Sequence, residues 1–265
     1  MAETDIREAA AAGTFYPRAV DDLRHTVEDL LSHAREKGHG GVRGIIAPHA
    51  GYIYSGSVAA EAFAALKPLK NAIKRIVIIG PAHFVSFRGI AAPSVRAFAT
   101  PLGEVPLDVA AIGSLVELPQ IVIDDVPHAF EHALEVELPF LQFLFGPIPV
   151  IPLVVGVATV DEVADVLSRL WDTVTLLVVS SDLSHYHDYE TARRRDAETA
   201  KAIERCDEGA IGLDDACGSL ALRGMLIEAK RRGLAIERLD LRNSGDTAGD
   251  HRRVVGYGAW IIHDG

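Results

Sequence analysis

The chain has 265 residues, of which 49% are hydrophobic and 24% are charged, as is typical of a globular protein. Its net charge of −11 argues against a nucleic-acid backbone or an anionic membrane as the main partner, and no segment has the roughly 18 consecutive apolar residues of a membrane span. Two cysteines, Cys206 and Cys217, are too few for a disulfide framework, and the acidic start of the chain does not resemble a signal peptide. We therefore expect a cytoplasmic protein.

Helical and extended segments alternate along the chain. The first expected helix covers residues 20–35, where apolar residues recur every three or four positions. The next elements, in order, are a strand at 43–47, a helix at 57–66, strands at 75–80 and 89–92, a helix at 107–116 and a short strand at 121–123. They are followed by a helix at 131–145 that Pro139 kinks or restarts, a strand at 147–155, a helix at 160–171, a strand at 174–180, helices at 189–205 and 219–232, and extended runs at 235–241 and 254–263.

This alternation predicts a three-layer α/β/α fold around a central sheet. The last two extended runs have little helix between them, which predicts an antiparallel pair and therefore a mixed sheet. No internal repeat or long linker divides the chain, so we expect residues 1–265 to form a single domain.

Two of the expected strands lead directly into a histidine. The apolar run 44–48 ends at His49, and the run 75–82 ends at His83. Because the C-terminal ends of parallel strands meet at one edge of a sheet, we expect the two imidazoles to face a shared site. Either histidine alone is more typical of a hydrogen-bonded loop residue, but together they favour a metal site or an acid–base centre.

The densest polar cluster is the segment 180–187, which reads Ser-Ser-Asp-Leu-Ser-His-Tyr-His. Asp182 is a candidate for capping the following helix or for orienting an imidazole, and the sequence leaves both roles open. His185 is a candidate general acid or base, because an ordinary pKa of about 6.5 suits proton transfer near neutral pH.

Three further features carry weaker signals. His132 and Glu135 share one face of the expected helix, and we favour a structural or substrate-facing role for His132 over direct metal ligation. Cys217 stands at a helix start, which favours a reactive or metal-binding thiolate, although a small buried residue in a tight turn is an equal alternative. The glycine-rich stretch 243–251, which contains Asp246, forms either a long turn or a flap over a site.

Taken together, these segments resemble the Memo family, whose prokaryotic members are called AmmeMemoRadiSam system protein B. The resemblance runs from about residue 10 to the C-terminus, and its matching motifs are, in order, AGTFYP at 12–17, APHAGY at 47–52, GPAH at 80–83, EHALE at 131–135, SSDLSH at 180–185 and ACG at 216–218. The resemblance implies a fold similar to that of the class III extradiol dioxygenases, which are non-haem iron enzymes that open catechol rings.

The resemblance also implies a set of site residues. The metal ligands would be His49, His83 and Cys217, with Asp182 and His185 as catalytic residues in the same site. A thiol thus replaces the carboxylate of the dioxygenase triad, and because a thiolate is a softer ligand, one metal ion is expected, with iron favoured and copper or zinc as alternatives. The expected substrate-binding residues are His132, Tyr52 and Asp246.

Two functions are compatible with this resemblance. The first is a metal-dependent oxidoreductase, similar to a dioxygenase, that acts on a small molecule or a peptide. The second is a non-catalytic module that binds peptides or a partner protein through the same pocket. The family name further implies that a radical-SAM protein and an AMMECR-type protein act in the same pathway.

Overall fold

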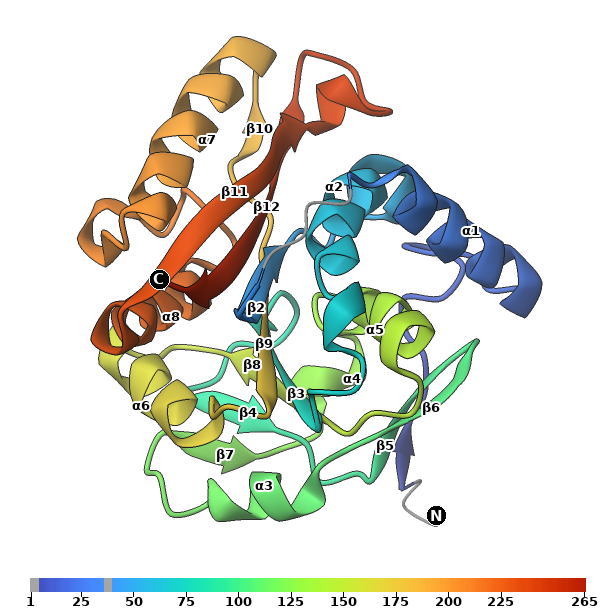
Figure 1. Cartoon of the computed structure of the whole chain (residues 1–265), viewed down its shortest axis with the longest axis vertical. Coiled ribbons are helices and arrows are strands. Elements are labelled where there is room, and N and C mark those ends of the chain that lie inside the picture. Colours follow the sequence, from blue (N-terminus) through green and yellow to red (C-terminus); the bar gives the residue numbers. More distant parts are fainter. Residues whose placement is uncertain (1–4, 36–39) are drawn as a thin grey trace.

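The computed structural model describes residues 5–35 and 40–265. A large mixed sheet runs through the molecule, and helices cover both of its faces (Figure 1). One face carries α1 (Val20–His33), α2 (Tyr52–Ala64) and α5 (Leu138–Phe145), and the other carries α6 (Val160–Leu170), α7 (Tyr189–Glu204) and α8 (Ser219–Arg232). The predicted α/β class with a mixed central sheet between helical layers is therefore confirmed.

The centre of the sheet consists of four parallel strands. In spatial order they are β2 (Val42–Ala47), β9 (Thr175–Ser180), β3 (Arg75–Pro81) and β8 (Val150–Val155). Almost every side chain in these strands is buried, as expected for apolar, β-branched strands that helices cover on both sides.

Antiparallel strands extend the sheet on both sides. Next to β2 lies β12 (Val254–Asp264), which also pairs with β11 (Leu234–Asn243), so the predicted antiparallel pair is confirmed. On the other side β4 (Ile90–Ala92) is antiparallel to β8, and β7 (Ile121–Ile123) is parallel to β4.

Four short strands lie outside the predicted elements. β10 (His185–His187) pairs with β12, and a separate small sheet contains β1 (Ile6–Arg7), β5 (Ala97–Thr100) and β6 (Gly103–Pro106). Each has only two to four residues, which is too short for a periodic pattern to be detected.

The predicted helix at 131–145 is wrong in its first half. The chain instead forms α4 (Val126–Ala129), a loop, a 3-10 turn (Glu135–Glu137) and then α5, with Pro139 in the first turn of α5. Proline is favoured there because its missing N–H would have no partner in the first turn. Glu131 and His132 consequently lie in a loop, not on one face of a helix. Helix α3 (Val109–Ser114) is shorter than predicted.

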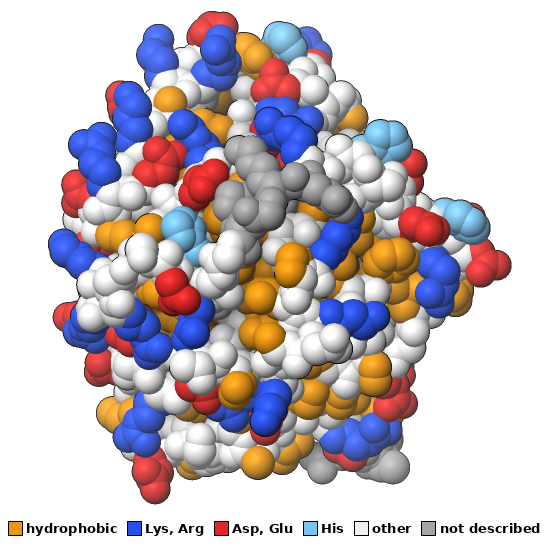
Figure 2. All heavy atoms as spheres, viewed as in Figure 1, with side chains coloured by type: hydrophobic (Ala, Val, Ile, Leu, Met, Phe, Trp, Pro, Cys, Tyr) orange, Lys and Arg blue, Asp and Glu red, His pale blue; other side chains and the backbone are white. Residues whose placement is uncertain are grey.

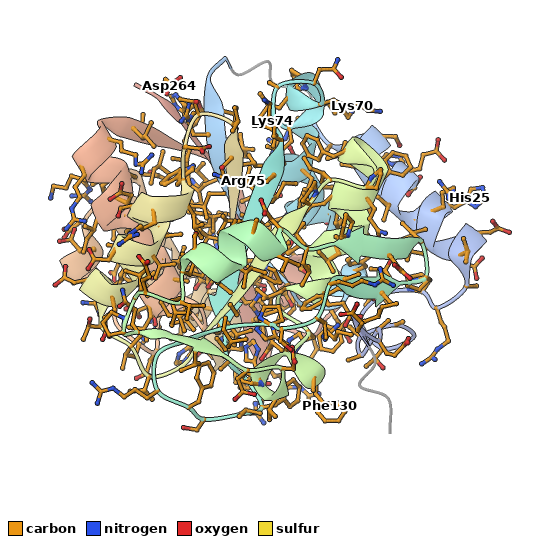
Figure 3. All side chains as sticks on the ribbon, turned by 90° about the horizontal axis from the view of Figure 1, so that it is seen from below. His25, Lys70, Lys74, Arg75, Phe130 and Asp264 are labelled. Atoms are coloured by element: carbon orange, nitrogen blue, oxygen red, sulfur yellow. The ribbon has the colours of Figure 1, made fainter. Side chains whose placement is uncertain are left out.

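The parallel strands place their C-terminal ends on one edge of the sheet. Figure 3 shows Arg75, where β3 begins, on the side of Lys74 and Asp264, whereas Phe130 lies toward the opposite side. The loops that carry the candidate site residues follow the C-terminal ends of the strands, on this second side. The sheet therefore brings segments far apart in sequence to a single edge.

The surface seen in Figure 2 carries acidic and basic side chains interspersed with one another, with apolar side chains between them. Among the residues that the structure describes, no helix combines the length and the apolar composition needed to cross a bilayer.

Candidate metal centre

Three imidazoles meet at the C-terminal edge of the sheet. His49 follows β2, His83 follows β3, and His132 lies in the loop before the 3-10 turn; one ring nitrogen from each lies within 4.8 Å of those from the other two. The rings of His83 and His132 are stacked, with centroids 4.6 Å apart, and His49 meets both edge-on at 5.2 and 5.5 Å. The structure thus brings His49 and His83 together and adds His132 to them.

Hydrogen bonds on the far side of the rings orient two of these histidines. His83 Nδ1 lies 2.8 Å from the Oε1 atom of Glu131, and because a carboxylate can only accept, Nδ1 is the donor. His49 Nδ1 lies 2.7 Å from Ser180 Oγ, whose own hydroxyl is directed 2.7 Å to the carbonyl of Ala133. Both rings therefore carry a proton on Nδ1 and turn Nε2 toward the cluster, as metal-binding histidines do.

Glu131 is the fixed negative charge beside the cluster. Burial alone would raise the pKa of its carboxyl, but the hydrogen bond and the charge of His83, together with the backbone amides of His83 and Ala133, lower it to about 2. The side chain is only 2% exposed. An ionised carboxylate in this position holds the His83 ring and favours a cation nearby.

Two of the histidines remain neutral in the absence of a cation. Burial and, in the same direction, the neighbouring imidazoles lower the pKa of both His49 and His132 to about 3. Their lone pairs are consequently available at neutral pH. His132 Nδ1 is buried, lies 3.4 Å from Glu131 Oε1 and has no hydrogen-bond partner, so the cluster contains a polar atom that a ligand would satisfy.

Cys217 lies next to one histidine of the cluster, His49, at the start of α8. Its sulfur lies 3.3 Å from His49 Nε2 and accepts a hydrogen bond from the amide of Asp182, also at 3.3 Å. The sequence left a reactive thiolate and a small buried residue as equal alternatives, and in the structure burial and the charge of Asp182 raise the pKa of this thiol. The thiol keeps its proton unless a cation replaces it, and His49 Nε2 is within reach of that proton.

These distances are compatible with a bound metal ion. One imidazole nitrogen and one thiolate on the same tetrahedral ion lie about 3.5 Å apart, close to the separation of His49 and Cys217. Three imidazole nitrogens on such an ion lie about 3.4 Å apart, so the histidines need an inward movement of about 1 Å. Neutral imidazoles, an adjacent carboxylate and a thiol that can lose its proton form a suitable environment for iron, copper or zinc.

Asp182 and His185 lie beside this cluster with different surroundings. Asp182 Oδ1 accepts a hydrogen bond from the backbone amide of His49 at 2.9 Å, so the carboxylate supports the His49 loop directly. Burial raises the pKa of Asp182 to about 6, while the nearby His185 acts in the opposite direction. His185 is only partly buried and lines the cavity in front of the cluster.

Two of the expected substrate-binding residues lie outside this cavity. Tyr52 is buried between Tyr16 and Phe140, and its hydroxyl donates to the carbonyl of Val136 at 2.8 Å. Asp246 accepts hydrogen bonds from the Tyr189 hydroxyl and from the amide of Asn243, which stabilises a short turn. Their placement does not support a substrate contact, because Tyr52 packs in the core and Asp246 is hydrogen-bonded within the turn.

A cavity of about 700 Å³ opens in front of the histidines. Its wall includes all three imidazoles of the cluster and His185, and the 243–251 loop contributes Ser244, Gly249 and Asp250. The loop therefore forms part of the wall of the site cavity. Two neighbouring cavities of about 450 and 410 Å³ both reach Cys217.

Three residues of the site lie within the matching motifs but were not predicted as site residues. Phe15 stacks on His132 with ring centroids 4.2 Å apart, and Ser180 and Glu131 orient the other two histidines. Glu131 adjoins His132 in the EHALE motif, and this adjacency was the available signal. Phe15 lies far away in sequence, and only the fold brings it to the cluster.

The segment that carries Phe15 is fixed by a buried ion pair. Arg7 contacts Glu135 at 2.5 Å, and the same carboxylate accepts hydrogen bonds from the amides of Ala10 and Ala11 and from the Tyr16 hydroxyl. Glu135 is fully buried, so these donors replace the water that it has lost. The N-terminal segment is thereby held against the loop that carries His132.

Comparison with known proteins gives a consistent result. The family model for Memo-like proteins matches residues 7–261. A MEMO1 family protein from Aeropyrum pernix is 37% identical, over 96% of this chain and 98% of that protein. A MEMO1 family protein from Methanosarcina acetivorans is 33% identical, over 97% of this chain and 99% of that protein.

One solved structure is similar to this chain in its fold. The crystal structure of the uncharacterized protein JW3007 from Escherichia coli K12 superposes with a TM-score of 0.57 and covers 84% of this chain and all of that one. The two sequences are only 12% identical, so the similarity concerns the arrangement of the sheet and its helices.

Proposed function

The chain belongs to the Memo-like family, and on that premise we propose that it binds one metal ion, with iron favoured, and acts as a metal-dependent oxidoreductase. The ligands in this proposal are His49, His83 and Cys217, and His132 lies close enough to be a fourth. The observation that carries it is the distance of 3.3 Å between the Cys217 sulfur and His49 Nε2, at a cluster of three imidazoles.

The cavity supports a catalytic site over a purely structural one. Structural metal sites are closed by four protein ligands, whereas catalytic sites keep a position open for water or substrate. Here about 700 Å³ of space borders the histidines. A bound iron ion would supply Lewis acidity and one-electron chemistry at this position.

The protein's own residues would move the protons. His185 lines the cavity, and its imidazole would accept or donate the proton there. Asp182 would assist through its charge, since it is buried and close enough to influence the pKa of its neighbours. Phe15 would shield one side of His132 from water.

One observation favours the alternative of a binding module. Phe84, Val157 and Leu213 are 60–68% exposed and border the second cavity, which reaches His83 and Cys217. Exposed apolar side chains around a cavity suit an apolar side chain of a peptide or a partner protein. In that case the cluster would serve recognition and would not need a redox-active ion.

Metal content tests the proposal. We would purify the protein without oxygen after growth with added iron, and measure metal per chain together with iron spectroscopy. Wild type should hold close to one ion per chain, and His49→Ala and His83→Ala should lose it, whereas His25→Ala, a change on the exposed face of α1, should not. A wild-type chain with no more metal than His83→Ala would contradict the proposal and favour the binding module.

A further inference from the structure

The mouth of the site cavity contains a strained aromatic residue. Tyr186 has a φ of +61°, a left-handed conformation that side chains other than glycine rarely adopt. It lies in β10, where His185 and His187 pair with Val255 and Val254 of β12 and the register shifts between them. A bulge of this kind redirects a side chain, and Tyr186 is 63% exposed and lines the cavity.

A cation sits on this aromatic ring. The guanidinium carbon of Arg253, the residue just before β12, lies 4.9 Å from the centroid of the Tyr186 ring. Arg253 lines the same cavity, is exposed and forms no ion pair with any carboxylate in the described ranges 5–35 and 40–265. Its neighbour Arg252 differs, because Asp250 binds it at 2.8 Å.

The rest of the cavity wall suits an aromatic body. Phe15, Tyr54 and Tyr257 line it together with Tyr186, and the ring of His185 meets Tyr186 edge-on at 5.7 Å. An anion held by Arg253 would leave the remainder of its molecule facing these rings and the histidines. Arginine provides a planar fork of N–H donors that matches carboxylate and phosphate oxygens.

We propose that Arg253 and Tyr186 form a recognition site for the anionic group of an aromatic small molecule, with a carboxylate or a phosphate bound by the guanidinium and the ring enclosed by the aromatic wall. The strained backbone at Tyr186 positions its ring to hold Arg253 at the cavity mouth. The proposal rests on the proposed function in one respect only, namely which part of the bound molecule reacts. That part would lie toward the histidine cluster.

The test measures binding to metal-free protein, so that it does not depend on whether iron is the native ion. Three probes share a ring and differ in charge: benzoate, phenyl phosphate and the neutral benzyl alcohol. Dissociation constants from calorimetry or ligand-detected NMR should show that at least one of the anions binds more tightly than the alcohol. Added salt should weaken the binding of the anions and leave the binding of the alcohol unchanged.

Variants at adjacent arginines provide a matched comparison. Arg253→Ala should weaken the affinity for the bound anion by about tenfold, since a hydrogen-bonded charge is lost. The affinity for benzyl alcohol should not change. Arg252→Ala, with the same change one residue away, should bind like wild type. Equal anion affinity in wild type and Arg253→Ala, equal losses in both variants, or no preference of wild type for an anion would overturn the inference. Absence of metal from the wild-type chain would contradict the proposed function alone.

Discussion

Cys217 and His49 are 168 residues apart in the chain, yet the cysteine sulfur lies 3.3 Å from the histidine Nε2. The contact links the start of α8 to the end of β2 and places the thiol next to one histidine of the cluster. It also gives the most direct test of the ligand set, because the chain contains one other cysteine, Cys206, away from the site.

Cys217→Ser should reduce metal affinity by about 100-fold or more, because a neutral hydroxyl replaces a soft anionic ligand. Cys206→Ser should leave the affinity unchanged. Cys217→Asp should recover part of the affinity for iron(II) but not for copper(I), which prefers sulfur. The measurement is a metal titration under reducing conditions for wild type and the three variants. If Cys217→Ser bound metal as tightly as wild type, the thiol would not be a ligand, and the three histidines would remain as the proposed ligands.

Substitutions of His185 and Asp182 should have different effects on metal affinity in a titration. His185→Ala should bind metal like wild type, because its ring lines the cavity without supporting any proposed ligand. Asp182→Ala should weaken binding by about tenfold, since its carboxylate holds the amide of His49 in place. If His185→Ala lost its metal, His185 would be a ligand and not a proton-transfer group.

Much of the sheet was predictable, whereas the composition of the site was only partly so. Long buried strands such as β3 and β9 have continuous apolar runs, and a histidine after β3 stands out in such a sequence. The contact of Phe15 with His132 depends on a buried ion pair between Arg7 and Glu135, and no local pattern encodes a pairing across that distance. The state of Cys217 could not be decided from the sequence, because burial, which the sequence does not report, outweighs the effect of the helix start on its pKa.

The Arg7–Glu135 pair should contribute strongly to stability. Arg7→Met would leave a fully buried carboxylate without its cation, and we expect a loss of about 3–5 kcal/mol in the free energy of unfolding. The exposed pair Arg252–Asp250 is the control, and Arg252→Met should have no measurable effect. Urea denaturation of both variants checks this. If Arg7→Met left the free energy of unfolding nearly unchanged, the amides of Ala10 and Ala11 and the Tyr16 hydroxyl alone would be sufficient partners for Glu135.

Asp196 should make stability depend on pH. Its carboxylate accepts a hydrogen bond from the amide of Ser184, but Oδ2 has no partner, and burial raises its pKa to about 6 despite the opposing influence of Ser184, His187 and Arg195. The folded state thus favours the protonated form. Because the folded pKa exceeds the unfolded one, the unfavourable contribution is absent at low pH and grows as the pH rises through 4 to 6.

The comparison is with Asp196→Asn, which cannot ionise. Between about pH 5 and about pH 8 the stability of wild type relative to this variant should fall by about 1.5 kcal/mol. Denaturation curves at both pH values give the difference. A constant difference would mean that Asp196 titrates at its ordinary pKa in the folded protein.

Tyr186 should also carry a measurable strain. Glycine adopts a positive φ without penalty, so Tyr186→Gly should be about 1 kcal/mol more stable than Tyr186→Ala, the reverse of the usual order for these two residues. Both variants lose the exposed ring, so the comparison isolates the backbone. Thermal or urea denaturation measures it, and greater stability of the alanine variant would indicate that the left-handed conformation relaxes in solution.

The position of β12 has a consequence for how the protein is made. This strand follows every other strand in the chain, yet it lies between β2 and β11 and also pairs with β10. During synthesis, the β2 edge and the partner edges of β10 and β11 have to wait for residues 254–264 to leave the ribosome. A nascent chain that stalls earlier presents unpaired, largely apolar strand edges, and such edges are prone to join those of other chains. Slow translation of the β12 segment would therefore favour aggregation of the partly made chain.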